Sequence, residues 1–398
     1  MVFKKEKLGK LLSKVGSGVT PKGGSDSYVP EGVPLIRSQN VLWGKLSTEG
    51  IAFIDAQQHA KMSGSFVLPN DVLLNITGAS IGRACVVPSS LGEANVNQHV
   101  CILRVGDKLD SEYLSNFLIS QQGQREIALF QAGGNREGLN YEQVKSFEIP
   151  LPPLAEQRKI AEILRTWDEA IETAEAELKA KQERKRWLMD KLVDEGSVRG
   201  ATGNCRIKSH LREITSMASG GTPKTSVPEY YGGSIPWVSI SDMTSGTSYI
   251  NGSKTRITEE GLSNSSARIF KKGTILFAMY ASIGECRIAG LDLTTSQAIL
   301  GITPGPSIRS EYLYYFLCRI KETAKSYGQT GTQANLNKGI VGDFEISLPT
   351  LEEQDRILDV LKTCDTDVEK ATMMISSLRT QKRGLMQKLL TGEVRVAA

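Results

Sequence analysis

The stretch LAEQRKIAEILRTWDEAIETAEAELKAKQERKRWLMDKL, residues 154–192, decides the architecture of this chain. Its seam residues recur at steps that alternate between four and three. This spacing is a heptad pattern, which lets a helix bury one stripe of side chains against another helix. The seam positions are Ile160, Leu164, Trp167, Ile171, Ala174, Leu178, Lys181, Lys185, Leu188 and Leu192.

The same seam returns 197 residues later. A single amphipathic helix usually packs on its own domain, but two matched seams are buried most simply against each other. The sequence therefore predicts two long helices paired antiparallel, spanning roughly 50 Å at 1.5 Å per residue, as a spacer between two globular domains. The second set is Ile357, Leu361, Cys364, Val368, Ala371, Ile375, Leu378, Lys382, Leu385 and Leu389, so only Lys181, Lys185 and Lys382 depart from apolar residues.

The segments that precede the two helices also repeat. Thr20-Pro21-Lys22 returns as Thr222-Pro223-Lys224, and Ala79-Ser80-Ile81-Gly82 returns as Ala281-Ser282-Ile283-Gly284. Apolar runs between turn residues predict strands at 33–36, 71–74 and 100–105, and helical spacing predicts a helix over 113–130. The predicted fold class is α+β, with two pseudo-symmetric mixed α/β domains and two coiled-coil helices. The predicted boundaries are 1–150 and 200–347 for the domains, and 151–199 and 348–398 for the helices.

Composition sets broad limits on the kind of protein. The chain has 398 residues, 23% of them charged, with a net charge of +4, which permits nucleic-acid binding without requiring it. No apolar run approaches the length of a membrane span, and no secretory signal is expected at the N-terminus. Six cysteines without CxxC pairing indicate reduced thiols in a cytoplasmic protein. With three histidines and no His-Cys cluster, no metal site is expected.

Catalytic motifs are not found in the sequence. The run Gly220 to Thr225 lacks the spacing of a phosphate-binding loop, and Pro223 stands where a backbone donor is needed. Gly16-Ser17-Gly18 lacks the third glycine of a dinucleotide fingerprint. Neither a nucleophile elbow nor an Asn-Pro-Pro-aromatic methylation motif occurs. The residues themselves therefore offer no catalytic motif.

Two similar domains on a spacer indicate a reader of two half-sites, and DNA half-sites lie roughly 34 Å apart per helical turn. Arg, Asn and Gln are the side chains that pair with guanine and adenine edges, and they gather in Gly-rich loops. A solvated loop residue is the alternative for each one. The predicted DNA-binding residues are Thr20, Lys22, Arg37, Gln39, Asn40, Arg83, Gln98 and Arg136 in the first domain, and Thr222, Lys224, Ser239, Ser241, Asp242, Gln297 and Gln333 in the second.

Matched positions of the two domains fall into two sets. Lys22/Lys224 and Gln98/Gln297 agree, whereas Arg37/Ser239 and Arg83/Glu285 differ. Phosphate and scaffold contacts should agree if both domains grip a backbone, and base-reading contacts should diverge. We therefore predict phosphate contacts for the two lysines and base contacts for the divergent pairs, which also include Asn40/Asp242 and Arg136/Gln333.

The duplicated order of these motifs resembles the specificity subunit of type I restriction–modification systems, over nearly the whole chain. The strongest motifs are the Leu-Pro-x-Leu-x-Glu-Gln-x-x-Ile segments at 151–160 and 348–357, the Thr-Pro-Lys loops and the Ala-Ser-Ile-Gly turns. The resemblance implies that each domain reads one half of a split double-stranded DNA target. It also implies that the helices set the gap and scaffold two modification subunits for adenine methylation. Restriction subunits would join for cleavage. The resemblance implies that this chain is not an enzyme and holds no cofactor of its own, with S-adenosylmethionine, ATP and Mg expected on the partner subunits.

Glu156-Gln157 and Glu353-Gln354 stand at the helix starts, off the seam. We expect these four residues to contact a partner subunit, with a helix-dipole role for the glutamates as the alternative. Two further hypotheses remain for the whole chain. One is an enzyme with a site between the domains, which turnover by the purified chain would reveal. The other is a scaffold that binds only protein, which a salt-dependent DNA-binding assay would distinguish.

Overall fold

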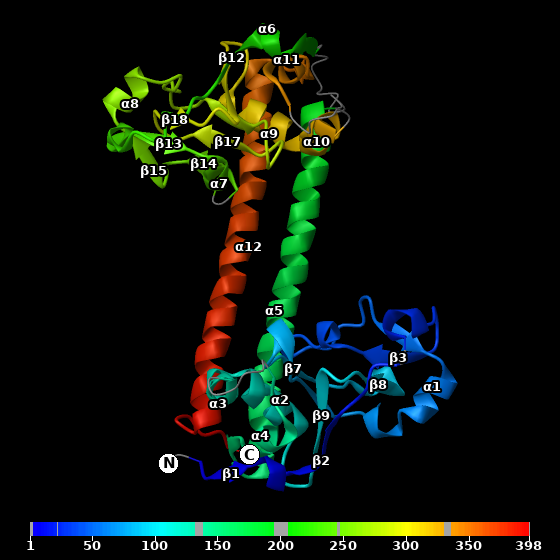
Figure 1. The fold of residues 1–398 in the computed structure, drawn as a ribbon. Coiled ribbons are helices and arrows are strands. Elements are labelled where there is room, and N and C mark those ends of the chain that lie inside the picture. Colours follow the sequence, from blue (N-terminus) through cyan, green and yellow to red (C-terminus); the bar gives the residue numbers. More distant parts are fainter. Residues whose placement is uncertain are drawn as a thin grey trace. The chain divides into compact units, whose positions relative to one another are not determined.

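The computed structural model describes residues 3–21, 23–131, 138–194, 206–244, 247–329 and 336–397. The chain divides into two compact units, Met1–Glu175 with Met373–Ala398, and Ala176–Thr372. Each unit contains one globular repeat and one part of each of the long helices α5 (Leu154–Met189) and α12 (Leu351–Thr391) (Figure 1). Among the described residues, no helix combines the length and the apolarity that crossing a membrane requires.

The first unit holds two four-stranded sheets, ordered β2-β9-β6-β7 and β4-β3-β8-β5, and the pair β1-β10. The strands predicted at 33–36, 71–74 and 100–105 are confirmed as β3, β6 and β9. All four residues of β6 are buried, which explains its continuous apolar run. The strands are β1 Lys5–Lys7, β2 Leu12–Ser17, β3 Val33–Ile36, β4 Ala52–Ile54, β5 Phe66–Val67, β6 Val72–Asn75, β7 Ala84–Val86, β8 Ala94–Val96, β9 Val100–Val105 and β10 Glu148–Pro150.

The helices of the first repeat pack on these sheets and on the long helices. The apolar face of α2, with Tyr113 and Phe117, shares a core with Leu164 of α5 and Leu389 of α12. The single helix expected over 113–130 was wrong, because Ser120 takes an extended conformation and divides it into α2 and α3. The helices are α1 Ala56–Lys61, α2 Ser111–Ile119, α3 Gln121–Gln131 and α4 Tyr141–Ser146, with 3-10 turns η1 Leu8–Lys10, η2 Gly24–Ser27, η3 Ser38–Asn40, η4 Ser63–Ser65, η5 Gly78–Ser80 and η6 Ser89–Leu91.

The second unit repeats this topology with a five-stranded sheet, β12-β19-β16-β17-β14, a three-stranded sheet, β15-β13-β18, and the pair β11-β20. The order β12-β19-β16-β17 corresponds to β2-β9-β6-β7, which confirms the internal repeat in three dimensions. The strands are β11 Ile207–His210, β12 Thr215–Ser219, β13 Tyr231–Val238, β14 Tyr249–Ile250, β15 Thr255–Ile257, β16 Ile275–Ala278, β17 Cys286–Ala289, β18 Thr294–Thr295, β19 Ile299–Pro304 and β20 Glu345–Leu348.

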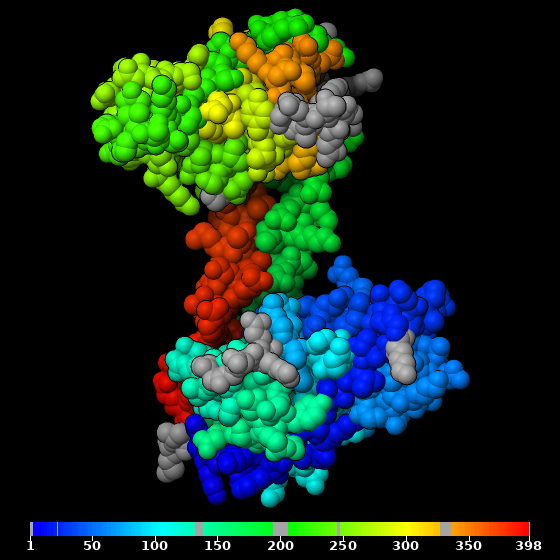
Figure 2. Space-filling view, in the orientation of Figure 1, coloured from blue at the N-terminus to red at the C-terminus, as the bar shows by residue number. Residues whose placement is uncertain are grey.

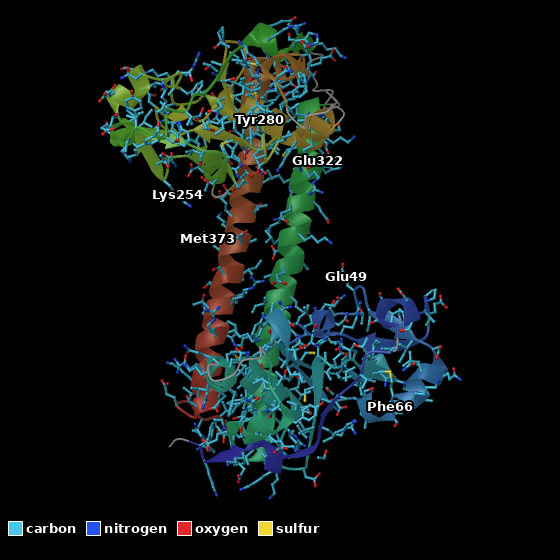
Figure 3. All side chains as sticks on the ribbon, in the orientation of Figure 1. Glu49, Phe66, Lys254, Tyr280, Glu322 and Met373 are labelled. Carbon is cyan, nitrogen blue, oxygen red and sulfur yellow. The ribbon has the colours of Figure 1, made fainter. Side chains whose placement is uncertain are left out.

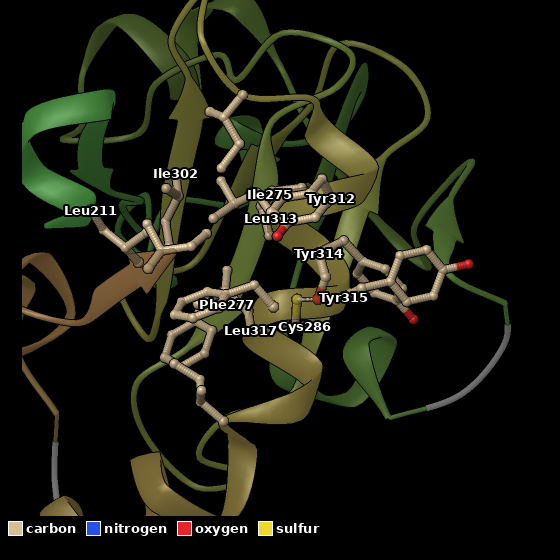
Figure 4. Packing of buried hydrophobic residues seen from close by; sticks show 14 of the residues in the cluster. Leu211, Ile275, Phe277, Cys286, Ile302, Tyr312, Leu313, Tyr314, Tyr315 and Leu317 are labelled. Carbon is tan, nitrogen blue, oxygen red and sulfur yellow. Dashed lines mark hydrogen bonds between the residues drawn. The ribbon is translucent and has the colours of Figure 1, made fainter. Parts of the chain in front are cut away.

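The core of the second unit, like that of the first, forms where a helix packs on the central strands of a sheet. Tyr312 and Leu313 of α9 pack against Phe277 and Ile302 from the central strands of the sheet (Figure 4). The helices are α6 Leu211–Ile214, α7 Ile240–Met243, α8 Glu259–Ser263, α9 Ser310–Arg319, α10 Lys321–Gln329 and α11 Lys338–Gly342; the 3-10 turn η8 covers Pro228–Tyr230 and a π-helical turn, η7, covers Asp190–Asp194.

The long helices pair antiparallel, as predicted. Within the first unit, Asp168 pairs with Lys382 at 2.5 Å and Glu175 pairs with Arg379 at 2.5 Å, so one residue number rises as the other falls. Figure 2 shows α5 (green) and α12 (orange to red) packed side by side. The pairing buries the apolar seam residues Ile160, Leu164, Ile171, Ala174, Ile357, Leu361, Cys364, Ile375 and Leu389.

Two of the lysines that interrupt the seam have a common explanation. Lys382 pairs with Asp168 in the first unit, and Lys185 pairs with Asp365 in the second. Lys185 and Lys382 are 197 residues apart, and so are Asp168 and Asp365, so the two contacts are equivalent. A lysine can bury its aliphatic stem in a seam while its ammonium reaches a carboxylate at the edge. Lys181 instead pairs with Glu177 on its own helix.

Candidate nucleic-acid interface

A polar groove of about 410 Å³ lies on the first repeat. Three segments line it: the η3 turn supplies Ser38 and Gln39, the segment from Thr77 to Arg83 follows β6, and His99 precedes β9. The fold places these segments together because β3 and β6 end, and β9 begins, near the groove. Gln39 and Arg83 were predicted from the sequence, and the structure brings them to one groove.

A chain of polar contacts runs along one side of this groove. Thr20 Oγ1 donates a hydrogen bond to Gln98 Oε1, and Gln98 Nε2 lies 3.1 Å from His99 Nε2. His99 Nδ1 in turn lies 2.5 Å from Thr77 Oγ1. Sequence reasoning singled out Thr20 and Gln98 but missed His99 and Thr77. The position of His99 directly after Gln98 was the available signal.

The corresponding loops of the second repeat keep the Thr–Gln hydrogen bond but carry different residues at the groove positions. Thr222 Oγ1 donates to Gln297 Oε1, which repeats the contact between Thr20 and Gln98. Ala298 replaces His99 at the next position, so the polar chain ends at Gln297. Tyr280 stands where the first repeat has Gly78, and this tyrosine is 36% exposed on the turn after β16 (Figure 3).

Two predicted base-reading residues of the first domain have structural roles. Asn40 is fully buried: its Oδ1 accepts from Arg37 N at 3.1 Å, and its Nδ2 donates to Ser47 O at 3.1 Å. This corrects the prediction for Asn40, because a buried amide occupied by backbone groups cannot reach a base edge. The Arg37 guanidinium donates to Gly50 O at 2.7 Å and lies 5.5 Å from the ring centre of Tyr28.

The equivalent residues of the second domain also brace a loop. Asp242 Oδ2 accepts from Ser239 N at 2.9 Å and from Ser239 Oγ at 2.8 Å, which caps α7. Ser239 and Asp242 thus form a capping pair with the same backbone contact as Arg37 and Asn40, but both stay partly exposed, so base contact by these two residues stays a prediction. Ser241 is exposed, with its hydroxyl 2.8 Å from Ser239 Oγ.

Only some of the remaining predicted DNA-binding residues lie in the described part of the chain. Lys224 is exposed in its loop, whereas Lys22, Arg136 and Gln333 lie outside the described residues. Glu285, the counterpart of Arg83, pairs with Lys321 and with Arg287, so this acid supports its own domain. Arg83 is half-buried in the groove and forms no ion pair with any carboxylate in the described part of the chain.

The Glu-Gln motifs at the helix starts are internal braces. Gln157 is fully buried; its Oε1 accepts from Asp110 N at 2.9 Å and its Nε2 donates to the carbonyls of Lys108 and Pro152. Gln354 repeats this pattern with Arg309 N and the carbonyls of Ser307 and Pro349. We predicted that these two glutamines contact a partner subunit. The structure shows instead that each one fixes the start of a long helix to its own domain.

The two glutamates of these motifs face arginines of the chain itself. Glu156 is 3% exposed and accepts from Arg395 Nε and from an Arg395 Nη, each at 2.7 Å. Glu353 pairs with Arg206 at 2.9 Å and keeps part of its side chain exposed. Burial therefore overturns the docking prediction for Glu156, whereas contact between a partner and Glu353 stays a prediction.

The Glu156–Arg395 contact predicts a specific acid sensitivity. The hydrogen bonds from Arg395 hold the pKa of Glu156 below its ordinary value of 4.5. A lowered pKa in the folded state means that the contact stabilises the fold fully above that value and stops doing so as pH falls through the folded pKa. We expect the hydrogen-exchange protection of the 394–397 segment, taken relative to the intrinsic rate at each pH, to fall below about pH 4.5 in the native protein. In Glu156→Gln the protection should already be low at pH 7, and an unchanged acid profile in this variant would contradict the assignment.

The described part of the chain also bears on metals and thiols. No group of three or more His, Cys, Asp or Glu residues among the described residues could hold a metal ion. The five cysteines within those residues are free, and four of them are buried. Burial raises the pKa of both Cys85 and Cys101 to about 12, so these thiols stay protonated and unreactive.

The family model for the type I restriction modification DNA specificity domain matches the chain twice, at residues 6–182 and 208–373. Among curated proteins, a type I restriction enzyme MjaIX specificity subunit from Methanocaldococcus jannaschii is 37% identical over 162 residues, which are 40% of this chain and 38% of that relative. The MjaVIII specificity subunit of the same organism is 26% identical over 376 residues, which are 88% of this chain and 86% of the relative.

A solved structure, described as showing complex assembly and conformational transition of the type I R-M system, shares the fold. Its TM-score is 0.68 at 17% identity, with 99% of this chain and 98% of that chain covered. The chain belongs to the type I restriction–modification DNA specificity family, which confirms the predicted resemblance. It is a DNA-recognition subunit with two recognition domains and not one of the catalytic chains.

Proposed function

We propose that this chain reads a bipartite DNA target, one half-site per recognition domain. The observation that carries the proposal is the contrast between the repeats: the Thr–Gln contacts that hold the Thr-Pro-Lys loops are the same, and the adjoining groove residues differ. Groups that grip a backbone need not change with sequence, whereas groups that read bases must. Gln39, Arg83 and His99 are the proposed readers of the first half-site, and Ser241 and Tyr280 those of the second.

The proposal includes partner subunits. Two modification subunits would dock on the chain and methylate adenine in each half-site with S-adenosylmethionine, and restriction subunits would add ATP- and Mg-dependent cleavage. The chain's own part is to fix where those subunits act. The equivalence of the Asp168–Lys382 and Asp365–Lys185 contacts supports this role, because a pseudo-symmetric helix pair offers similar surfaces to two copies of one partner.

Methylation mapping of host DNA tests the proposal, with this gene deleted and the modification gene kept in place. We expect a split motif with modified adenine in both halves to disappear on deletion. Exchange of residues 1–150 for another recognition domain should then change one half of the motif only. An unchanged methylation pattern, with all subunits expressed, would leave this chain as a protein scaffold without a reading function.

Replacement of Lys224 by alanine tests the proposed phosphate contacts. We expect binding to weaken equally on all DNA sequences and the salt slope of log K to fall by about one, because one phosphate contact is lost. Filter binding at several salt concentrations measures both effects. Lys271→Ala serves as the control, since its ammonium pairs with Asp292 at 2.7 Å. A loss confined to one target sequence would show that Lys224 reads bases.

A further inference from the structure

The second unit contains a pocket of about 210 Å³ between the β14 segment, α9 and α12. Tyr249, Tyr314 and Tyr315 contribute aromatic surface, and three carboxylates outnumber two lysines, Lys362 in the lining and Lys185, which lies 5.6 Å from the ring centre of Tyr315. The charged residues of the lining are Glu311, Asp365, Glu369 and Lys362. The pocket therefore combines rings with excess negative charge, a combination that favours a cation.

Two of the three carboxylates already have partners. Glu311 accepts from Tyr249 OH at 3.1 Å and from Lys362 Nζ at 3.3 Å. Asp365 pairs with Lys185 and with Tyr315 OH. Glu369 is exposed, and no described residue forms an ion pair with it. This carboxylate is the one available to a ligand.

The first repeat shows what this carboxylate can hold. There, Lys45 Nζ lies 2.6 Å from Glu172 Oε1. Glu172 and Glu369 are counterparts, separated by the 197 residues of the seam repeat, and Thr247 stands 202 residues after Lys45, the same separation as Asn40 and Asp242. The second repeat thus keeps the carboxylate and replaces the lysine by threonine, which lines the pocket.

We propose that this pocket binds an alkylammonium group supplied from outside the chain. The group would take the place that the Lys45 ammonium holds in the first repeat, with its charge on Glu369 and its alkyl part against the tyrosine rings. Two sources share this chemistry: a lysine of a partner chain and a free polyamine. The site is independent of base reading, so its failure would leave the proposed DNA function intact.

Spermidine is the probe for the free source, titrated into the full chain by calorimetry. We expect one site, with affinity lowered about tenfold or more in both Thr247→Lys and Glu369→Gln. Thr247→Lys supplies the ammonium from within and should not damage the fold, since the first repeat has this arrangement. Lys45→Thr is the control in the first repeat and should leave the affinity unchanged, because Ser115 and Asn116 stand there in place of Tyr314 and Tyr315. Equal affinity of all four proteins would overturn the assignment of spermidine to this pocket.

Carbodiimide cross-linking tests the protein source, in the assembled complex with modification subunits. This arm rests on the proposed function. A cross-link between Glu369 and a lysine of another chain, absent in Glu369→Gln and in Thr247→Lys, would identify the ligand as a partner lysine. Spermidine binding that is sensitive to both variants, without that cross-link, would identify a free polyamine. The absence of both results would overturn the proposal.

Discussion

Replacement of Arg83 by alanine is expected to relax the first half of the DNA target and leave the second half unchanged. Arg83 lines the groove of the first repeat and has no carboxylate partner in the described part of the chain, so its guanidinium is available for a bidentate contact with guanine. One such contact contributes about 1–3 kcal/mol of discrimination. Methylation at the intended first half-site should therefore fall roughly 10- to 100-fold relative to mismatched sites.

The matched control for this prediction is Glu285→Ala in the second repeat. Glu285 occupies the corresponding position but pairs with Lys321 and Arg287, so its loss should lower stability without changing base preference. Arg83→Lys is informative as well, because lysine keeps the charge and loses the bidentate geometry. Single-molecule methylation sequencing of a library with both half-sites randomised gives the readout. Equal weakening on every sequence in Arg83→Ala would make this residue a phosphate contact instead.

Much of the fold could be predicted from the sequence because its signals are periodic. The heptad seams specify paired helices, and buried runs such as Val72–Asn75 specify central strands. The break at Ser120 could not be predicted, because apolar spacing continues through it and only the backbone conformation of one residue divides the helices. Lys185 and Lys382 were visible as exceptions in the seam, but their carboxylate partners lie on the other helix.

The candidate site could be predicted only in part. Gln39, Arg83 and Gln98 do lie at or beside one groove, as their grouping in Gly-rich loops indicated. Asn40 and Asp242 looked equally suitable, but both side chains satisfy backbone groups of their own loops. Polar residue type alone cannot distinguish these cases, because exposed readers and loop caps use the same side chains. His99 was missed because its partner Thr77 is distant in sequence and adjacent only in the fold.

Replacement of Gln157 by alanine is expected to destabilise the first unit by roughly 3 kcal/mol, since it removes the hydrogen bonds to Asp110 N and to the carbonyls of Lys108 and Pro152, of which the Pro152 contact is buried. The unfolding midpoint should fall by on the order of 10 °C. Gln354→Ala should have a similar effect in the second unit because it removes the equivalent contacts.

Thermal and denaturant unfolding of the full chain, followed by domain-resolved hydrogen exchange, measures this effect and assigns it to a unit. Gln182→Ala is the control, as this glutamine is exposed on the same helix and should be neutral. A partner-contacting role makes the opposite prediction: unchanged stability of the isolated chain and weaker assembly with modification subunits. Since Gln157 is fully buried, a partner could reach it only after the helix start had separated from its domain, and that separation would itself appear as lost stability.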